Sequence, residues 1–195
     1  EYAVITRENI TFYDEQLHPF EKKYQRIDWD ATAAEKNGYP DFMLKEMYEQ
    51  PSTVRETIGT RVTAGAPTQV DGLDFTAAQL QNLHQIYIIG CGTAMHAGLA
   101  AKPMFEHLTH IPTQVDVASE FRYRDPLVDD RTLCIFISQS GETADTIAAL
   151  RLAKAAGAAT LAVSNVIGSS ITREADYTVY THAGPEIAVA STKAY

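Results

Sequence analysis

The sequence predicts an α/β fold, a three-layer sandwich with a parallel sheet flanked by helices, and three observations support this prediction. Short apolar runs recur in the second half of the 195 residues, as expected of strands that are buried on both faces. Stretches with apolar residues at helical spacing lie between these runs. Strands and helices therefore alternate, which is typical of a parallel sheet covered by helices on both sides.

The expected elements follow in order from these patterns. Strands are predicted where β-branched and aromatic residues gather, at 85–89, 113–117, 132–137, 160–164 and 176–180. Helices are predicted between them, at 94–108 and 142–156. The second helix shows the pattern well, because Arg151 and Lys154 fall opposite its apolar face and Gly157 follows its end.

Residues 1–36 have a different pattern and suggest an antiparallel meander. Its strand-like runs are at 2–5, 10–13 and 24–27. A linker with helices is expected at 37–72, where Pro51 should divide one helix from the next because proline has no N–H. The expected inner residues of these helices are Phe42, Met43, Met47 and Ile58. The α/β domain should occupy residues 73–195.

Composition limits the classes of partner. The chain is 45% hydrophobic and has a formal charge of −9 with few basic clusters, which argues against nucleic acid as a partner. No run approaches the roughly 18 apolar residues of a membrane span, so we expect no membrane partner. Cys91 and Cys134 form no CxxC pair, so the reducing cytoplasm is the expected location.

The most informative segment lies between the predicted strand at 132–137 and the helix after it. Its residues are Ser138, Gln139, Ser140, Gly141, Glu142 and Thr143. The start of a helix presents unpaired N–H groups and a partial positive charge, which stabilise an anion there. Three hydroxyl groups and an amide add donors, so the segment predicts a phosphate site that needs no basic side chain. An ordinary helix cap with polar neighbours is the alternative.

A similar turn follows the predicted strand at 85–89. Gly90 and Gly92 let the backbone approach a ligand closely, and Thr93 adds a hydroxyl group where the next helix starts. The turn is not a dinucleotide-binding fingerprint, because Met95 stands where the third glycine would be. A tight turn without a ligand is the alternative for this segment alone.

Other reactive side chains have weaker patterns. Cys91 could be a nucleophile at a helix start, but the spacing assigns it no His or Asp partner. Cys134 lies in an apolar run and should belong to the core. His107 and His110 have no further ligands in a metal-binding pattern, so we expect no metal and no cofactor.

Charged residues near these turns are expected to have structural roles. The basic run Arg122-Tyr123-Arg124 is flanked by Glu120 and Asp125, which favours local ion pairs over anion binding. Glu142 would repel a phosphate, so its side chain should face away from the site. Near the end of the chain, residues 188–193 are small and rich in hydroxyl groups, and a helix is expected to begin at 191–195.

Five segments together resemble the family of glutamine–fructose-6-phosphate aminotransferases, also called glucosamine-6-phosphate synthases. They are GCGTA (90–94), ASEFRYR (118–124), SQSGETADT (138–146), GSSITREAD (168–176) and GPEIAVASTKAY (184–195). The SQSGET motif alone is shared by the wider sugar-isomerase (SIS) superfamily, whereas ASEFRYR and ASTKA are more specific. Residues 41–51 resemble the helix that opens the family's isomerase half, and residues 1–36 resemble the end of its glutaminase domain.

The resemblance implies a fold, an activity and a set of binding residues. It implies the SIS fold and an enzyme that makes glucosamine 6-phosphate from fructose 6-phosphate and glutamine. Ammonia would pass from a glutaminase domain to an isomerase half built from two SIS domains, and the protein would be a homodimer. The residues that would hold the sugar phosphate are Ser138, Gln139, Ser140 and Thr143. Those that would contact the sugar are Thr93, Val189 through its backbone, and Ser191.

The chain also departs from the family pattern. The glutaminase cysteine and the second SIS domain, with its catalytic side chains, are not among these residues, so the chain alone should be inactive. Ala94 stands where the family commonly has serine, which removes one donor. A stand-alone phosphosugar isomerase and a non-catalytic sugar-phosphate sensor are the alternatives. The first needs an acid/base pair at the rim, and the second needs a basic DNA-binding domain.

Overall fold

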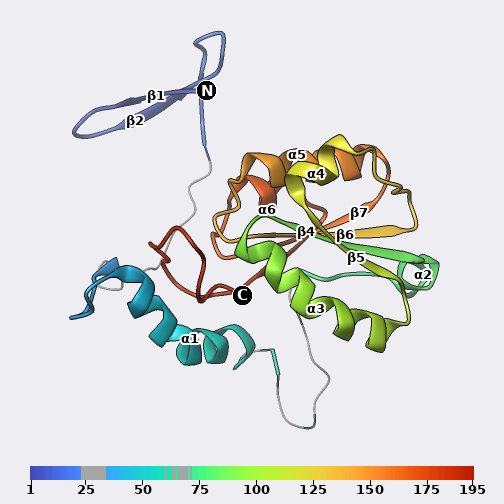
Figure 1. Ribbon diagram of the computed structural model, residues 1–195. Coiled ribbons are helices and arrows are strands. Elements are labelled where there is room, and N and C mark those ends of the chain that lie inside the picture. Colours follow the sequence, from blue (N-terminus) through green and yellow to red (C-terminus); the bar gives the residue numbers. More distant parts are fainter. Residues whose placement is uncertain (23–33, 60, 63–64, 66–69, 71) are drawn as a thin grey trace.

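The computed structural model describes residues 1–22, 34–59, 61–62, 65, 70 and 72–195, and its centre is a five-stranded parallel sheet (Figure 1). The strands are β4 (Gln85–Gly90), β5 (Thr113–Val117), β6 (Thr132–Ser138), β7 (Ala159–Ser164) and β8 (Tyr177–Tyr180). Each predicted strand is confirmed to within one residue at either end.

Helices cover both faces of this sheet. The long helix α3 (Thr93–Thr109) lies on one face. The helices on the other face are α4 (Ala118–Tyr123), α5 (Ala144–Ala155) and α6 (Ser170–Glu174) (Figure 1). The two predicted helices are confirmed, although α5 begins two residues later than expected. The patterns do not reveal α4, α6 or α2 (Ala77–Asn82), because five or six residues are too few to show helical periodicity.

The core forms two apolar layers, one on each face of the sheet. Side chains alternate between the faces along a strand, so Ile86 and Ile88 pack in the layer under α3, while Tyr87 and Ile89 pack under α4 and α5. Gly98 lets α3 approach the sheet closely, since a Cβ atom there would lie 2.8 Å from the Cγ2 atom of Ile88. Burial on both faces explains why the strands read as continuous apolar runs.

The strand order, β5-β4-β6-β7-β8, places a topological switch between β4 and β6. The chain leaves β4 through α3 to reach β5 at one edge, and it then crosses back through α4 to β6 on the other side of β4. The connections that follow β4 and β6 therefore diverge at the carboxyl ends of neighbouring strands. Open parallel sheets bind their ligands in the crevice at such a point.

A second, antiparallel sheet is formed near the N-terminus by β1 (Tyr2–Ile5), β2 (Ile10–Tyr13) and β3 (Pro19–Phe20). Figure 1 shows β1 and β2 apart from the α/β domain. The first two strands of the expected meander are confirmed at the predicted residues. The expected strand at 24–27 lies outside the described residues. The strand that pairs with β2 in the structure is β3, which comes before residue 24.

Residues Phe42–Gly59 form one helix, α1, so the prediction that Pro51 separates two helices is wrong. Proline lacks the N–H that would donate to the carbonyl oxygen of Met47. The helix continues because this is the one backbone bond that proline removes. The hydroxyl groups of the next two residues, Ser52 and Thr53, add bonds to the carbonyl oxygens of Glu49 and Gln50 in the same turn, at 2.7 and 3.1 Å.

The buried face of α1 is polar, which corrects the expected inner residues. Phe42 is half-buried, and the other expected inner residues are about half exposed: Met43, Met47 and Ile58. The side chains that α1 does bury are Lys45, Glu46 and Thr53. The reason is that α1 packs against an irregular segment near the end of the chain, whose backbone N–H and carbonyl groups need polar partners.

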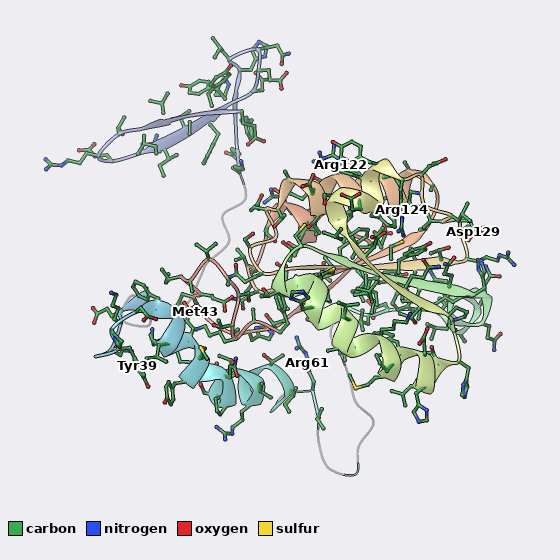
Figure 2. All side chains as sticks on the ribbon, viewed as in Figure 1. Tyr39, Met43, Arg61, Arg122, Arg124 and Asp129 are labelled. Atoms are coloured by element: carbon green, nitrogen blue, oxygen red, sulfur yellow. The ribbon has the colours of Figure 1, made fainter. Side chains whose placement is uncertain are left out.

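This irregular segment does not begin a helix, contrary to the prediction for 191–195. Figure 1 shows it between α1 and the α/β domain. Lys193 and Ala194 are buried there. Arg61, shortly after α1, adds a contact by donating to the carbonyl oxygen of Tyr180 at 2.7 Å (Figure 2).

Candidate functional site

A cavity of about 360 Å³ lies where β4 and β6 end, at the topological switch. Three segments line it: the turn between β4 and α3, the turn between β6 and α5, and residues near the end of the chain. The structure brings all seven predicted binding residues to this one cavity: Thr93, Ser138, Gln139, Ser140, Thr143, Val189 and Ser191. Their role in binding remains a prediction.

The β6–α5 turn (residues 138–143) leaves hydroxyl protons available to a ligand. The Ser138 hydroxyl oxygen accepts from the backbone N–H of Gly141 at 3.1 Å, and the Ser140 oxygen accepts from that of Glu142 at 3.2 Å. The hydroxyl groups of Ser138 and Thr143 lie 3.4 Å apart. Because the Ser138 and Ser140 oxygens act as acceptors inside the turn, their protons can turn to an anion, and the long contact between Ser138 and Thr143 can give way to bonds with the same anion.

Contacts outside the cavity fix the shape of this turn. The carbonyl oxygen of Gln139 accepts from the backbone N–H of Asn165 at 3.1 Å. Gly141 has a φ of +68°, and a Cβ atom there would lie 2.0 Å from the hydroxyl oxygen of Ser169. Only glycine fits this position, because both the backbone conformation and the neighbouring side chain exclude larger residues.

Glu142 faces away from the cavity, as predicted. Its carboxylate accepts from the backbone N–H of Ser170 at 2.7 Å, at the start of α6. This bond, with a weaker contribution from the Ser170 side chain, holds the pKa of the Glu142 carboxyl below its ordinary value. The negative charge is therefore directed to α6 rather than to a ligand beside α5.

Two helices begin at the cavity, and their electrostatics favour an anion. Thr93 is the first residue of α3, and Thr143 immediately precedes α5. Neither helix has a side-chain cap, so N–H groups of both first turns have no partner within the helix. None of the described residues that line the cavity is acidic or basic. The partial positive charge of the helix ends is thus not cancelled by a nearby carboxylate in the lining.

Residues 187–193 form the opposite side of the cavity, which we call the C-terminal wall. Val189 is fully exposed to solvent, and the contact predicted for it is through its backbone. The Ser191 hydroxyl donates to the carboxylate of Glu186 at 2.6 Å, so towards a ligand hydroxyl its oxygen can act only as an acceptor. This wall therefore offers acceptors, whereas the β6–α5 turn offers donors.

Tyr195 also lines the cavity, and sequence reasoning missed it. Desolvation raises the pKa of the Tyr195 phenol to about 12, although a hydrogen bond with the Gln139 backbone acts in the opposite direction. The phenol is therefore a neutral group at physiological pH. No local pattern marks this residue, because only the fold of the C-terminal wall brings it to β6.

The remaining candidates take structural positions. Cys91 lines the cavity, but its nearest polar contact is the Thr146 hydroxyl at 3.8 Å, and no described lining residue is His, Asp or Glu. Cys134 belongs to the core, as predicted, and burial raises the pKa of its thiol to about 12. Ala94 also lines the cavity, with its methyl group buried where serine would place a hydroxyl.

Arg122 of α4 and Arg124, which follows the end of this helix, form ion pairs, but not with the flanking residues that we expected. Arg122 contacts Asp145 of α5 at 2.8 Å, and Arg124 contacts Asp116 of β5 at 2.5 Å (Figure 2). These pairs form because α4 packs against both α5 and β5. Neither arginine lines the cavity.

Metal-binding clusters and membrane-spanning helices are both absent from the described residues. No three His, Cys, Asp or Glu side chains gather there as ligands for a metal ion. No helix in the same part of the chain is long and apolar enough to cross a membrane.

The fold and the cavity define a parallel α/β domain with a ligand crevice at its topological switch. The family model described as "SIS domain" matches residues 79–195, and the chain belongs to this family. The C-terminal domain of glucosamine-fructose-6-phosphate aminotransferase from Francisella tularensis has a similar structure, with a TM-score of 0.73 and 43% identity over 83% of this chain and 45% of that one. A phosphosugar isomerase-like structure from Clostridium difficile 630 has a TM-score of 0.65 and 26% identity over 79% of this chain and 41% of that one.

Curated relatives match almost the whole chain. The glutamine–fructose-6-phosphate aminotransferase (isomerizing) of Clostridium acetobutylicum is 55% identical over all 195 residues, which make up 32% of that protein. The enzyme of the same name from Thermus thermophilus is 49% identical over 98% of this chain and 31% of its own length. The chain therefore spans about a third of the length of the curated relatives that it matches.

Proposed function

We propose that this chain is the fructose 6-phosphate-binding part of an enzyme that converts fructose 6-phosphate and glutamine to glucosamine 6-phosphate and glutamate. The observation that carries the proposal is an uncharged cavity at the switch point, where two uncapped helices begin and Ser and Thr hydroxyl groups gather. Backbone N–H groups and hydroxyl groups are sufficient to hold a phosphate at a helix start. The names of the closely similar relatives supply the reaction.

The two sides of the cavity suggest the orientation of the substrate. The phosphate belongs at the β6–α5 turn, where Ser138, Ser140 and Thr143 can donate hydrogen bonds. The sugar hydroxyl groups belong at the C-terminal wall, because the carboxylate of Glu186 behind Ser191 disfavours a second anion there. Gln139 belongs to the β6–α5 turn and would contact the phosphate, whereas Thr93, the first residue of α3, would contact the sugar.

The chemical steps require more than this chain. None of the described lining residues can act as an acid/base pair, so we propose that the catalytic groups belong to other segments of the protein. The isolated chain should bind the sugar phosphate and catalyse no turnover. A stand-alone isomerase would need such a pair in this cavity, which disfavours that alternative.

The proposal extends to the organisation of the whole protein. Residues 1–36 would be the end of a glutaminase domain that supplies ammonia from glutamine, residues 37–72 a linker, and residues 73–195 the first of two SIS domains. Two isomerase halves would associate in a homodimer. The two unpaired thiols, Cys91 and Cys134, agree with a cytoplasmic enzyme.

A titration tests the binding claim. Fructose 6-phosphate should bind and unphosphorylated fructose should not, as measured by calorimetry or by NMR line positions. Ser140→Ala and Thr143→Ala should each weaken binding about fivefold or more, because each removes a hydrogen bond worth about 1 kcal/mol or more to a charged group. Thr109→Ala, at the far end of α3, removes an exposed hydroxyl and should leave the affinity unchanged. Equal binding of the two sugars would contradict the proposal.

A further inference from the structure

The C-terminal wall is held by two carboxylates that lie outside the cavity lining. The wall has no helix or strand of its own, so its backbone N–H groups need other partners. Glu186 and Glu46 supply these partners. The first carboxylate immediately precedes the wall in the sequence, and the second comes from the distant helix α1.

Glu186 closes the wall on itself. Its carboxylate accepts from the backbone N–H groups of Thr192 and Lys193 at 2.7 and 3.0 Å, and from the Ser191 hydroxyl at 2.6 Å. The chain between these residues therefore folds back over the carboxylate. This loop brings Val189 and Ala190 to the cavity.

Glu46 fixes the other end of the wall. It is only 1% exposed, and its carboxylate accepts from the backbone N–H groups of Ile187 and Ala188 at 2.5 and 3.1 Å. Hydrogen bonds to an ionised carboxylate are stronger than neutral ones, especially where water is excluded. These two N–H groups directly precede Val189, so the position of its carbonyl depends on Glu46.

Further contacts join α1 to the same wall. The Thr53 hydroxyl shares its proton between the carbonyl oxygens of Gln50 and Lys193, at 3.1 and 3.3 Å, and the Gln50 side-chain amide donates to the carbonyl oxygen of Thr192. The buried ammonium of Lys193 lies 2.7 Å from the carboxylate of Glu49. One face of α1 thus contacts the C-terminal wall through polar groups.

We propose that Glu46 and Glu186 are positioning residues for the sugar portion of the substrate, so that α1 is a structural part of the sugar site. The proposal rests on the function proposed above. The phosphate portion should be independent of these carboxylates, because the β6–α5 turn is held by different residues, Asn165 and Ser170 among them. Loss of either carboxylate therefore weakens sugar recognition and leaves phosphate recognition intact.

The test compares two ligands, fructose 6-phosphate and inorganic phosphate, with the 195-residue chain and its variants. The dissociation constant for inorganic phosphate, divided by that for fructose 6-phosphate, gives a ratio that isolates the part of the affinity that comes from the sugar. Glu46→Gln and Glu186→Gln keep the side-chain size but remove the charge, and each should reduce this ratio roughly tenfold while phosphate binding changes less than about twofold. Glu56→Gln, on the exposed side of α1, is the matched control and should change neither constant.

The outcomes separate the two proposals. The positioning role would be overturned by an unchanged ratio in both variants. It would also be overturned if folded variants lost affinity for both ligands equally. If Glu46→Gln does not fold, as judged by circular dichroism, Glu186→Gln decides by the same ratio. A wild-type chain that binds fructose 6-phosphate no more tightly than phosphate would instead contradict the proposed function.

Discussion

The β6–α5 turn and the C-terminal wall face the same cavity, but they depend on different parts of the chain. The turn consists of six consecutive residues whose hydroxyl groups bond to its own backbone. The wall depends on Glu46, which is 141 residues earlier in the sequence than Ile187. A local sequence motif can therefore indicate the first half of the site, whereas the second half exists only after α1 has docked.

The largest effect is expected at Gly141, because the turn has no room for a side chain. Gly141→Ala would place a Cβ atom 2.0 Å from the Ser169 hydroxyl oxygen, in a backbone conformation that alanine disfavours. We expect a loss of about 3 kcal/mol or more in the free energy of unfolding, together with loss of ligand binding. Urea denaturation and a fructose 6-phosphate titration would measure both.

Gly184 offers a matched control for this prediction. It also has a positive φ, of +69°, but a Cβ atom there would meet nothing within 4 Å. Gly184→Ala should cost only the backbone strain, about 1 kcal/mol. Equal losses at the two positions would show that crowding in the turn is unimportant.

An intermediate effect is expected at Asn165, which contacts the β6–α5 turn and the segment that leads to the C-terminal wall. Its side-chain amide donates to the carbonyl oxygen of Gly184 at 2.7 Å and accepts from the N–H of Ala183 at 2.8 Å, on the path to the wall. Its backbone N–H supports the turn and survives substitution. Asn165→Ala should destabilise the fold by about 2 kcal/mol. It should also weaken the binding of fructose 6-phosphate more than the binding of inorganic phosphate.

The control for Asn165 is Asn82→Ala, at the exposed end of α2. Thermal unfolding and the two titrations should be unchanged in this variant. If Asn165→Ala instead weakens the binding of inorganic phosphate and of fructose 6-phosphate equally, then this residue does not affect the sugar side of the site separately from the phosphate side.

The smallest effect is expected from Glu142. Its folded-state pKa is lowered, so its charge stabilises the fold above the ordinary carboxyl value near 4.5, and this contribution is lost as the pH falls through the lowered value. The side chain is exposed, so the contribution should be about 0.5 kcal/mol or less. The difference in unfolding free energy between the wild type and Glu142→Gln should be constant from pH 7 to about 5 and shrink below that. A difference that grows on acidification would contradict the assignment.

Local patterns were sufficient for the sheet and for the turns at its carboxyl edge. Strands buried on both faces leave apolar runs that can be read directly, and the glycines and hydroxyl groups after β4 and β6 mark the turns. The resemblance to a family added Val189 and Ser191, which have no distinct pattern of their own. All seven predicted binding residues consequently lie at one cavity.

Features that depend on docking could not be read in the same way. Apolar spacing pointed to Met43 and Met47 as inner residues, but α1 turns Lys45 and Glu46 inward because its neighbour is irregular backbone. Tyr195 reaches the cavity through the irregular fold at the end of the chain, which leaves no pattern in the sequence either. Hydrophobic periodicity predicts contacts with an apolar core, and this interface is polar.

The central claim is that an uncharged corner, made of helix N–H groups and hydroxyl groups, holds the phosphate of the sugar. The most direct measurement is a map of backbone amide chemical shifts as fructose 6-phosphate is added. We predict the largest changes at residues 138–144 and at Thr93, and the changes within 138–144 should also appear with inorganic phosphate. Changes that gather around basic residues such as Arg122 or Arg151, with the β6–α5 turn unaffected, would contradict it.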